Sequence, residues 1–419
     1  MISSLLIKPA GADCNMGCSY CFYKRAAGLY PDTPHPRMSP EVLRELVGQY
    51  MELSWHASCH PEEGASPTKD LGPSPADASV RAAQGDNTGA QGDKAPAQAA
   101  FCWQGGEPTL MGLDFYRQVV AFQQALGHSG QIVGNSLQTN GLLLTDEWAR
   151  FLARYRFLIG LSLDGPPEIH DHYRVNLGGQ PTHAQVVRAW HTLQRAGVET
   201  NLLCMVTSHS ADQAGLILGA LYDLGARFMQ FIPCLEAHPL TGELLPYTVT
   251  PEQYGDFLCQ LFDHWLPHRH EVSIRFFDDV VSRLAGHNNL VSCEFRPRCG
   301  EYLVVEHNGD LYACDFFVDR EHRLGNITTD SLAEVAAGEA LDHFAAAKGC
   351  YSNRCRDCEW LDFCLGGCPK HRLFPEGTLG SPTYLCESYR RFFAHALPLL
   401  REVANECLEA AKDAPSGGD

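Results

Sequence analysis

The sequence predicts an α/β protein with a parallel β-sheet, either open or curled into a partial barrel, followed by a cysteine-rich region. Six short apolar runs alternate with amphipathic helical segments in the first half of the chain. This alternation is typical of successive strand–helix units that build a parallel sheet. From about residue 291 to 389 the chain is dense in cysteine and has little periodicity, so a core there would need bound metal.

The expected strands are short apolar runs bounded by polar or glycine-containing segments. They span Leu5–Lys8, Phe101–Gln104, Gly134–Thr139, Phe157–Leu163, Asn201–Thr207 and Arg227–Ile232. In parallel sheets the functional side chains gather at the carboxyl ends of the strands. Residues that directly follow these runs are therefore the first candidates for a functional site.

The expected helices lie between the strands and after the last of them. The first has Ser39 as its N-cap and Pro40 at its first helical position, a favoured combination. A later helix begins after Thr250, with Gln253 completing a capping box. The other expected helices span about Asp114–Leu126, Asp146–Tyr155, His183–Ala196, Asp212–Leu224 and Tyr389–Ala411.

The stretch from His56 to Ala100 differs in composition from its surroundings. It is rich in Ala, Gly, Pro, Ser, Asp and Gln, and its only large aliphatic residues are Leu71 and Val80. Such a segment buries too little apolar surface to offset the entropy lost on ordering. We therefore expect a flexible surface insertion at residues 56–100, and a partner-binding loop is the functional alternative.

Length and charge exclude several classes of protein. A chain of 419 residues is too long for one ordinary hydrophobic core. We expect units at 1–235 and 291–390, joined by helices at 236–290 and followed by a helix and tail at 391–419. The net charge of −18 argues against nucleic-acid binding. No apolar run is long enough for a membrane span, and the N-terminus does not resemble a signal peptide. We therefore expect a cytoplasmic protein, and its 18 cysteines indicate reduced thiols and metal.

Three cysteines follow the first expected strand directly. Cys14, Cys18 and Cys21 lie in the segment CNMGCSYC, a C-x3-C-x2-C pattern. Three thiolates on one loop can hold three irons of a [4Fe–4S] cluster and leave the fourth iron open. The alternative is a structural zinc site that takes a distant fourth ligand, although zinc sites favour paired cysteines.

This trio, followed by Phe22 and Tyr23, resembles the signature of the radical S-adenosylmethionine (SAM) enzymes. In that family SAM chelates the open iron, and reductive cleavage of SAM releases a 5′-deoxyadenosyl radical. The segments QGGEP at 104–108 and SLDG at 162–165 also fit the family. The resemblance implies a partial (β/α)6 barrel. It also implies SAM contacts from Tyr20, Gly106, Ser162, Arg174 and Leu235.

Eight C-terminal cysteines resemble the SPASM domain, which carries two auxiliary [4Fe–4S] clusters in some radical SAM enzymes. They fall in the pattern C-x5-C-x9-G-x4-C, then C-x2-C-x5-C-x3-C-x17-C. The resemblance implies one cluster on Cys293, Cys299, Cys314 and Cys368, and a second on Cys355, Cys358, Cys364 and Cys386. The alternative is two structural zinc sites, because C-x2-C pairs also suit zinc.

Within this group the chain most resembles the anaerobic sulfatase-maturating enzymes. The resemblance rests on CNMGCSYCFY, QGGEPTL, SLDGPPEIHDHYRVN, QFIPCLE and the pair Cys314-Asp315, and covers the chain except for 56–100. Such enzymes convert a Cys or Ser in a C/S-x-P-x-R motif of a sulfatase to Cα-formylglycine. The resemblance implies Asp315 as the base, Tyr23 as a residue that positions the peptide, and an auxiliary cluster that takes up the second electron.

The expected partners follow from this resemblance. They are an unfolded or nascent sulfatase polypeptide and a low-potential electron donor such as a ferredoxin or flavodoxin, with the enzyme itself a monomer. One alternative is a SPASM peptide maturase that forms thioether or other cross-links on a ribosomal peptide with the same cofactors. Another is a non-enzymatic iron–sulfur or zinc-binding protein. Metal analysis separates the latter, because three clusters require about 12 Fe per chain.

Overall fold

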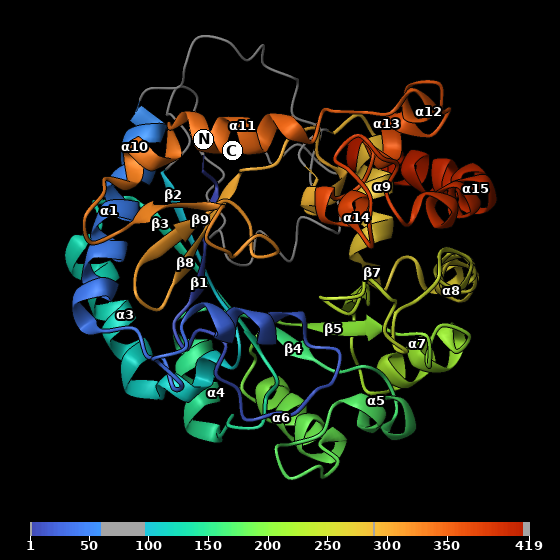
Figure 1. Ribbon diagram of the computed structural model, residues 1–419. Coiled ribbons are helices and arrows are strands. Elements are labelled where there is room, and N and C mark those ends of the chain that lie inside the picture. Colours follow the sequence, from blue (N-terminus) through green and yellow to red (C-terminus); the bar gives the residue numbers. More distant parts are fainter. Residues whose placement is uncertain (1, 60–96, 288–289, 414–419) are drawn as a thin grey trace.

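The computed structural model describes residues 2–59, 97–287 and 290–413. Its strands form one ten-stranded sheet in the order β10-β9-β8-β1-β2-β3-β4-β5-β6-β7. All neighbours from β8 through β1 to β7 run parallel, and only the β8–β9 and β9–β10 pairs are antiparallel. The sheet curves, and the helices of the first half lie along its outer side (Figure 1). The α/β fold with a partial barrel is therefore confirmed.

The six expected strands are all present, with ends shifted by at most three residues. They are β1 (Ser4–Lys8), β2 (Gln98–Trp103), β3 (Ile132–Thr139), β4 (Leu158–Ser162), β5 (Thr200–Val206) and β6 (Phe228–Pro233). Leu5 and Ile7 of β1 are fully buried in the main core. Lys8 follows at the carboxyl end of the strand on the other face, because successive side chains of a strand alternate.

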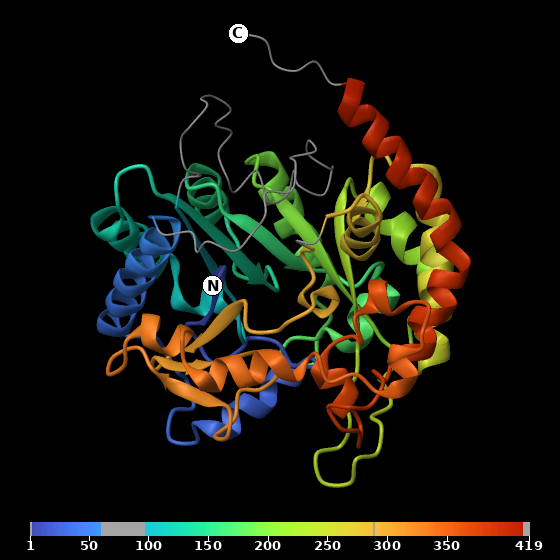
Figure 2. The same ribbon diagram turned by 90° about the horizontal axis from the view of Figure 1, so that it is seen from above.

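The expected helices are also present. They are α1 (Pro40–Cys59), α3 (Leu113–Leu126), α4 (Asp146–Arg154), α6 (His183–Arg195), α7 (Ala214–Asp223), α8 (Pro251–Trp265) and α15 (Cys386–Asp413). Both predicted N-caps are confirmed. Val42 N–H donates to Ser39 Oγ over 3.3 Å, and Thr250 and Gln253 form the capping box. The long helix α15 packs along α8 (Figure 2), and it begins three residues earlier than expected.

The expectation about the flexible insertion was wrong at its ends. The segment expected at 56–100 loses both ends to regular structure, because α1 continues to Cys59 and β2 begins at Gln98; residues 60–96 lie outside the described part. The cysteine-rich region, which shows little periodicity in the sequence, contains regular strands. It contains β8 (Tyr302–Glu306), β9 (Asp310–Tyr312) and β10 (Arg323–Asn326), which extend the barrel sheet past β1.

Several short elements had no signal in the sequence. They are β7 (Ser273–Ile274), α5 (Pro167–Tyr173), α9 (Arg275–Leu284), α10 (Leu332–Ala336), α11 (Glu339–Ala347), α12 (Asn353–Arg356), α13 (Leu361–Cys364) and α14 (Pro369–Leu373), with 3-10 turns at Phe22–Leu29, Pro108–Met111, Leu266–His268 and Cys293–Phe295. Most are too short to show a period. In the described residues no helix has both the length and the apolar character needed to cross a membrane.

Candidate active site

The three N-terminal cysteines lie at the carboxyl end of β1 and line one cavity. Cys14, Cys18 and Cys21 share this cavity with Tyr23 and Gly106 among others. Burial raises the pKa of the Cys14 thiol to about 12 and also raises that of Cys18. Thiols in such surroundings become thiolates when they bind a metal, because a coordinating cation removes the proton. The donor set therefore fits an iron–sulfur cluster.

Gly106 lies where the second strand's loop crosses the cysteine loop. Its N–H donates to Gly11 O over 2.8 Å, and Glu107 N–H donates to Asp13 O over 2.8 Å. A Cβ at position 106 would lie 2.0 Å from Asp13 O. Only glycine permits this close approach of two backbones. The GGEP segment is therefore held directly against the loop that carries Cys14.

A buried carboxylate joins two of the predicted SAM contacts. Asp164 Oδ2 accepts hydrogen bonds from Tyr20 Oη (2.6 Å) and Arg174 Nε (2.8 Å), and its Oδ1 accepts from Met205 N–H (2.9 Å). Burial opposes ionisation of Asp164, but the Arg174 charge and these hydrogen bonds outweigh it and lower the pKa. Asp164 thereby fixes Tyr20 and Arg174 in place. Sequence reasoning quoted this residue within SLDG and assigned it no role.

The other two predicted SAM contacts lie at strand ends. Ser162 is buried and ends β4. Leu235 is buried just after β6, and its carbonyl accepts a hydrogen bond from Lys370 Nζ over 3.0 Å. Both positions agree with the rule that functional residues of a parallel sheet gather at the carboxyl ends of its strands.

The expected base, Asp315, lies in a buried cluster of polar groups. Lys8 Nζ is 3.4 Å from Asp315 Oδ2, and Tyr302 Oη is 3.5 Å from Asp315 Oδ1 and 3.2 Å from Cys314 Sγ. Lys8 Nζ also lies 4.4 Å from the centre of the Tyr23 ring. Asp315 thus connects the end of β1, the N-terminal cysteine loop and an expected auxiliary-cluster ligand.

The pairing of β1 with β8 assembles this cluster. Lys8 and Glu306 are register partners in the two parallel strands, and Tyr23 Oη is hydrogen-bonded to Glu306. Both Lys8 and Glu306 are buried. Sequence reasoning missed Lys8, Tyr302 and Glu306. Only Lys8 carried a usable signal, because it ends a predicted strand.

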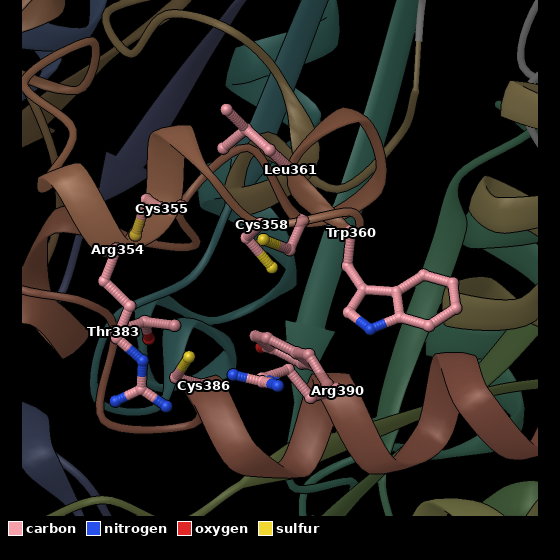
Figure 3. A pocket seen from close by; sticks show the side chains of 11 residues that line it. Arg354, Cys355, Cys358, Trp360, Leu361, Thr383, Cys386 and Arg390 are labelled. Carbon is pink, nitrogen blue, oxygen red and sulfur yellow. The ribbon is translucent and has the colours of Figure 1, made fainter.

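Four C-terminal cysteines line a second cavity. This cavity has Cys355, Cys358, Cys364 and Cys386 in its wall. Their side chains come from separate short segments and from the start of α15 (Figure 3). Arg354 and Arg390 also line it. A cavity surrounded by four sulfurs fits a cluster with four protein ligands.

The remaining four thiols form a separate group. Electrostatic effects on their pKa values link Cys293 with Cys368 and Cys299, and Cys314 with Cys368. Burial is the main effect and raises the pKa of Cys293 to about 12 and of Cys368 to about 11. Cys364 and Cys386, in contrast, are affected by thiols of the second cavity.

The spacing of these side chains does not suit a single metal ion. Within residues 2–59, 97–287 and 290–413, no group of three or more His, Cys, Asp or Glu side chains is arranged to hold one. A zinc site requires all its ligands within about 2.0–2.3 Å of one ion, whereas a cubane cluster keeps its thiolates apart on four different irons.

Comparison with known proteins agrees with this chemistry. The radical SAM superfamily matches residues 90–214, and the SPASM family, an iron–sulfur cluster-binding domain, matches residues 293–359. The cysteine-type anaerobic sulfatase-maturating enzyme of Clostridium perfringens is 33% identical, over 96% of this chain and 98% of that protein. The serine-type enzyme of Bacteroides thetaiotaomicron is 31% identical, over 96% of this chain and 92% of that protein.

Solved structures show the same similarity to an anaerobic sulfatase-maturating enzyme. The structure described as native anSMEcpe with bound AdoMet and Cp18Cys peptide superimposes with a TM-score of 0.79 and 33% identity, over 96% of this chain and 99% of that one. Streptococcus suis SuiB bound to S-adenosylmethionine, at 14% identity and a TM-score of 0.53 over 90% of this chain and 76% of that one, shares the fold alone. The chain therefore belongs to the anaerobic sulfatase-maturating enzymes, a family of radical SAM enzymes with a SPASM domain.

Proposed function

We propose that this enzyme oxidises a cysteine or serine in a C/S-x-P-x-R motif of a sulfatase polypeptide to Cα-formylglycine. The identity of 31–33% to both cysteine-type and serine-type relatives, over 96% of this chain, supports this function. The single observation that carries it in this chain is the position of Asp315, which lies next to a cluster ligand and within reach of groups beside the N-terminal cysteine loop.

The enzyme uses three [4Fe–4S] clusters and SAM. When bound, SAM and its cluster would supply the means to remove a hydrogen atom from the substrate Cβ, and the auxiliary clusters would supply a site for the second electron. We assign the SAM-binding cluster to Cys14, Cys18 and Cys21, whose shared cavity supports the assignment. We assign Tyr20, Gly106, Ser162, Arg174 and Leu235 to SAM itself.

The eight proposed ligands of the auxiliary clusters divide into two sets of four cysteines. We assign Cys355, Cys358, Cys364 and Cys386 to one cluster, which their common cavity supports. We assign Cys293, Cys299, Cys314 and Cys368 to the other, which the mutual electrostatic effects of these thiols support.

Asp315 accepts the proton of the substrate thiol or hydroxyl in this proposal. Loss of that proton, together with one hydrogen atom and one electron, converts the Cβ–S or Cβ–O single bond to a double bond, and water then releases the aldehyde from a thioaldehyde. Lys8 and Tyr302 hold the two carboxylate oxygens of Asp315, which fixes the direction in which the base points. Tyr23, anchored by Glu306, borders the same space and positions the peptide.

A polypeptide is the substrate. We further propose that it is an unfolded or nascent sulfatase chain, that a ferredoxin or flavodoxin supplies electrons, and that the enzyme is a monomer of the cytoplasm, where thiols stay reduced. The units expected at 1–235, 236–290, 291–390 and 391–419 remain our proposed divisions, although one sheet joins the first and third of them.

The decisive experiment incubates the reconstituted enzyme anaerobically with SAM, a reductant and a C-x-P-x-R peptide. Mass spectrometry should show conversion of the thiol to an aldehyde. A matched peptide with Ala in place of Cys should stay unmodified while SAM cleavage is still measured. An intact or cross-linked cysteine peptide would overturn the proposal in favour of a cross-linking maturase.

A further inference from the structure

Lys348 is a fully buried lysine at the carboxyl end of α11. Its side chain has no exposed surface. Nζ donates hydrogen bonds to the carbonyl oxygens of Cys293 (2.7 Å) and Glu294 (2.8 Å). An ammonium group has three N–H donors, so one of them is left for a further acceptor.

This ammonium group lacks a carboxylate partner at ion-pair distance within the described part of the chain. Glu294 is the acidic side chain that acts on it electrostatically. Its Oε2 instead accepts a hydrogen bond from Tyr389 Oη over 3.2 Å, so the Glu294 carboxylate is engaged by another group rather than paired with the ammonium group. A buried charge without a counter-charge is strongly unfavourable, so the fold around Lys348 requires negative charge from another source.

Lys348 Nζ is hydrogen-bonded to the backbone carbonyl of Cys293, and the thiols of Cys299, Cys293 and Cys368 act on the ammonium group electrostatically. All three belong to one proposed auxiliary ligand set, and none to the other. The second set faces arginine instead. Arg354 lines that cavity, but its side chain is about half exposed and forms an ion pair with Glu387.

We propose that Lys348 is the counter-charge of the auxiliary cluster on Cys293, Cys299, Cys314 and Cys368, and that it raises the reduction potential of this cluster. The inference rests on the proposed ligand set. Four thiolates on a [4Fe–4S] core leave a net negative charge, and one-electron reduction adds another. A buried ammonium therefore stabilises the reduced form more than the oxidised form, because Coulomb interactions are strong where water is excluded. Arg354 has a smaller effect on its cluster, because solvent and Glu387 screen its charge.

The test is a redox titration of the anaerobic holoenzyme followed by electron paramagnetic resonance. The Cys14→Ala, Cys18→Ala, Cys21→Ala full-length variant identifies the auxiliary signals. Lys348→Met and Lys348→Gln remove the charge, and Gln retains amide donors for the two carbonyl groups. At a fixed potential, both variants should lower the ratio of reduced to oxidised auxiliary cluster on Cys293, Cys299, Cys314 and Cys368 at least tenfold. A tenfold change corresponds to a shift of about 59 mV in the reduction potential of a one-electron couple. Lys348→Arg should stay near the wild-type potential.

Arg354→Met is the matched control, because it removes a positive charge beside the other cluster. It should shift only that cluster, and by less. Unchanged potentials in Lys348→Met and Lys348→Gln at full iron content would overturn the proposal. If both neutral variants lose about four Fe while Lys348→Arg keeps all of them, the cluster needs the charge and the proposal stands. Loss of the same iron in Lys348→Arg would overturn it.

This result is separable from the proposed function. The potential is measured without peptide, so a shift in an enzyme that forms no aldehyde would leave Lys348 in its role and remove only the function. Conversely, normal aldehyde formation with unshifted potentials would remove only the role of Lys348.

Discussion

Lys8 Nζ lies 3.4 Å from Asp315 Oδ2, although 307 positions separate the two residues in the sequence. The contact joins the end of the first strand to the loop that follows β9. Both side chains are largely buried, with 2% and 14% of their surface exposed. The carboxylate that we assign as the base is thus held by a charge from the element that also leads into the first cysteine loop.

Replacement of Asp315 by Asn should abolish proton transfer while sparing the clusters. The amide is isosteric but cannot accept the substrate proton, so aldehyde formation should fall by a factor of about 10²–10⁴. Iron analysis and mass spectrometry of the peptide measure the two effects. Asp319→Asn, four residues along the same loop and half exposed, is the matched control. Full activity of Asp315→Asn would exclude Asp315 as the base.

Replacement of Lys8 by Met should impair the same step less severely. The variant leaves the Asp315 side chain in place but removes the group that orients Oδ2, so more SAM should be cleaved per aldehyde formed. Lys8→Arg keeps the charge and should restore part of the coupling. Chromatography of 5′-deoxyadenosine and of the peptide gives the ratio. If this ratio is the same in wild type and Lys8→Met, the ion pair does not position the base.

Gly106→Ala should destroy the SAM site and leave the auxiliary clusters intact. The added Cβ would lie 2.0 Å from Asp13 O, so the GGEP segment must move away from the cysteine loop. We expect SAM binding and SAM cleavage to be lost, with spectroscopic signals of the auxiliary clusters retained. Gly28→Ala is a suitable control, because no atom lies within 4 Å of its added Cβ. Normal SAM affinity in Gly106→Ala would contradict the geometry.

Removal of the first three cluster cysteines should separate the cluster sites. The Cys14→Ala, Cys18→Ala, Cys21→Ala variant should retain about 8 of about 12 Fe and form no 5′-deoxyadenosine. A second triple variant at Cys259, Cys350 and Cys407, which are outside all proposed ligand sets, should keep all the iron. Any 5′-deoxyadenosine from the first variant would show that the ligand assignment is wrong.

The fold should become less stable in mild acid, because His170 takes up a proton more readily in the unfolded chain than in the folded one. Burial lowers the pKa of His170 to about 4, although Asp164 acts in the opposite direction. Its ring accepts the Asp164 N–H and contacts Thr182 Oγ1. Because the unfolded chain binds a proton below about pH 6.5, the neutral ring's contribution is complete above that pH. It is lost as the pH falls from about 6.5 toward 4.

Chemical unfolding of the holoenzyme at pH 7.5 and 5.5 measures this effect. At pH 5.5 the His170 side chain should lower the free energy of unfolding of the wild type by about 1.4 kcal/mol. His170→Gln cannot take up a proton and should show a correspondingly smaller loss between the two pH values. His191→Gln, an exposed position on α6, should follow the wild type. Equal losses in His170→Gln and wild type would show that His170 does not titrate in this way.

The sequence was sufficient for the strands β1 to β6 because each is a local apolar run. It was insufficient for β8 to β10, which have five, three and four residues and lie among cysteines whose spacing dominates the pattern. The pairing of β8 with β1 has no local signature, since register between strands is set by packing of distant segments. The same limit explains why the cysteine-rich region shows little periodicity in the sequence although it contains three strands.

The candidate site divides in the same way. Cysteine spacing and short motifs lie within a few residues of each other, so the ligands and several SAM contacts could be proposed from sequence. Tyr302 and Lys348 could not, because each acts through a partner that another strand or loop supplies. Lys8 had only the signal that it ends a predicted strand, and its partner Asp315 is 307 positions away. Their functions depend on burial, which composition alone does not reveal for a lysine.

The parallel ladder between Ser4 and Tyr302 has a consequence for biosynthesis. The strand that covers the outer edge of β1 emerges from the ribosome 298 residues after β1. At about 5–20 residues per second, this edge waits about 15–60 s for its partner. An uncovered strand edge is a template for unwanted pairing, so the nascent enzyme passes through a period of exposure to aggregation that ends only when β8 has been translated.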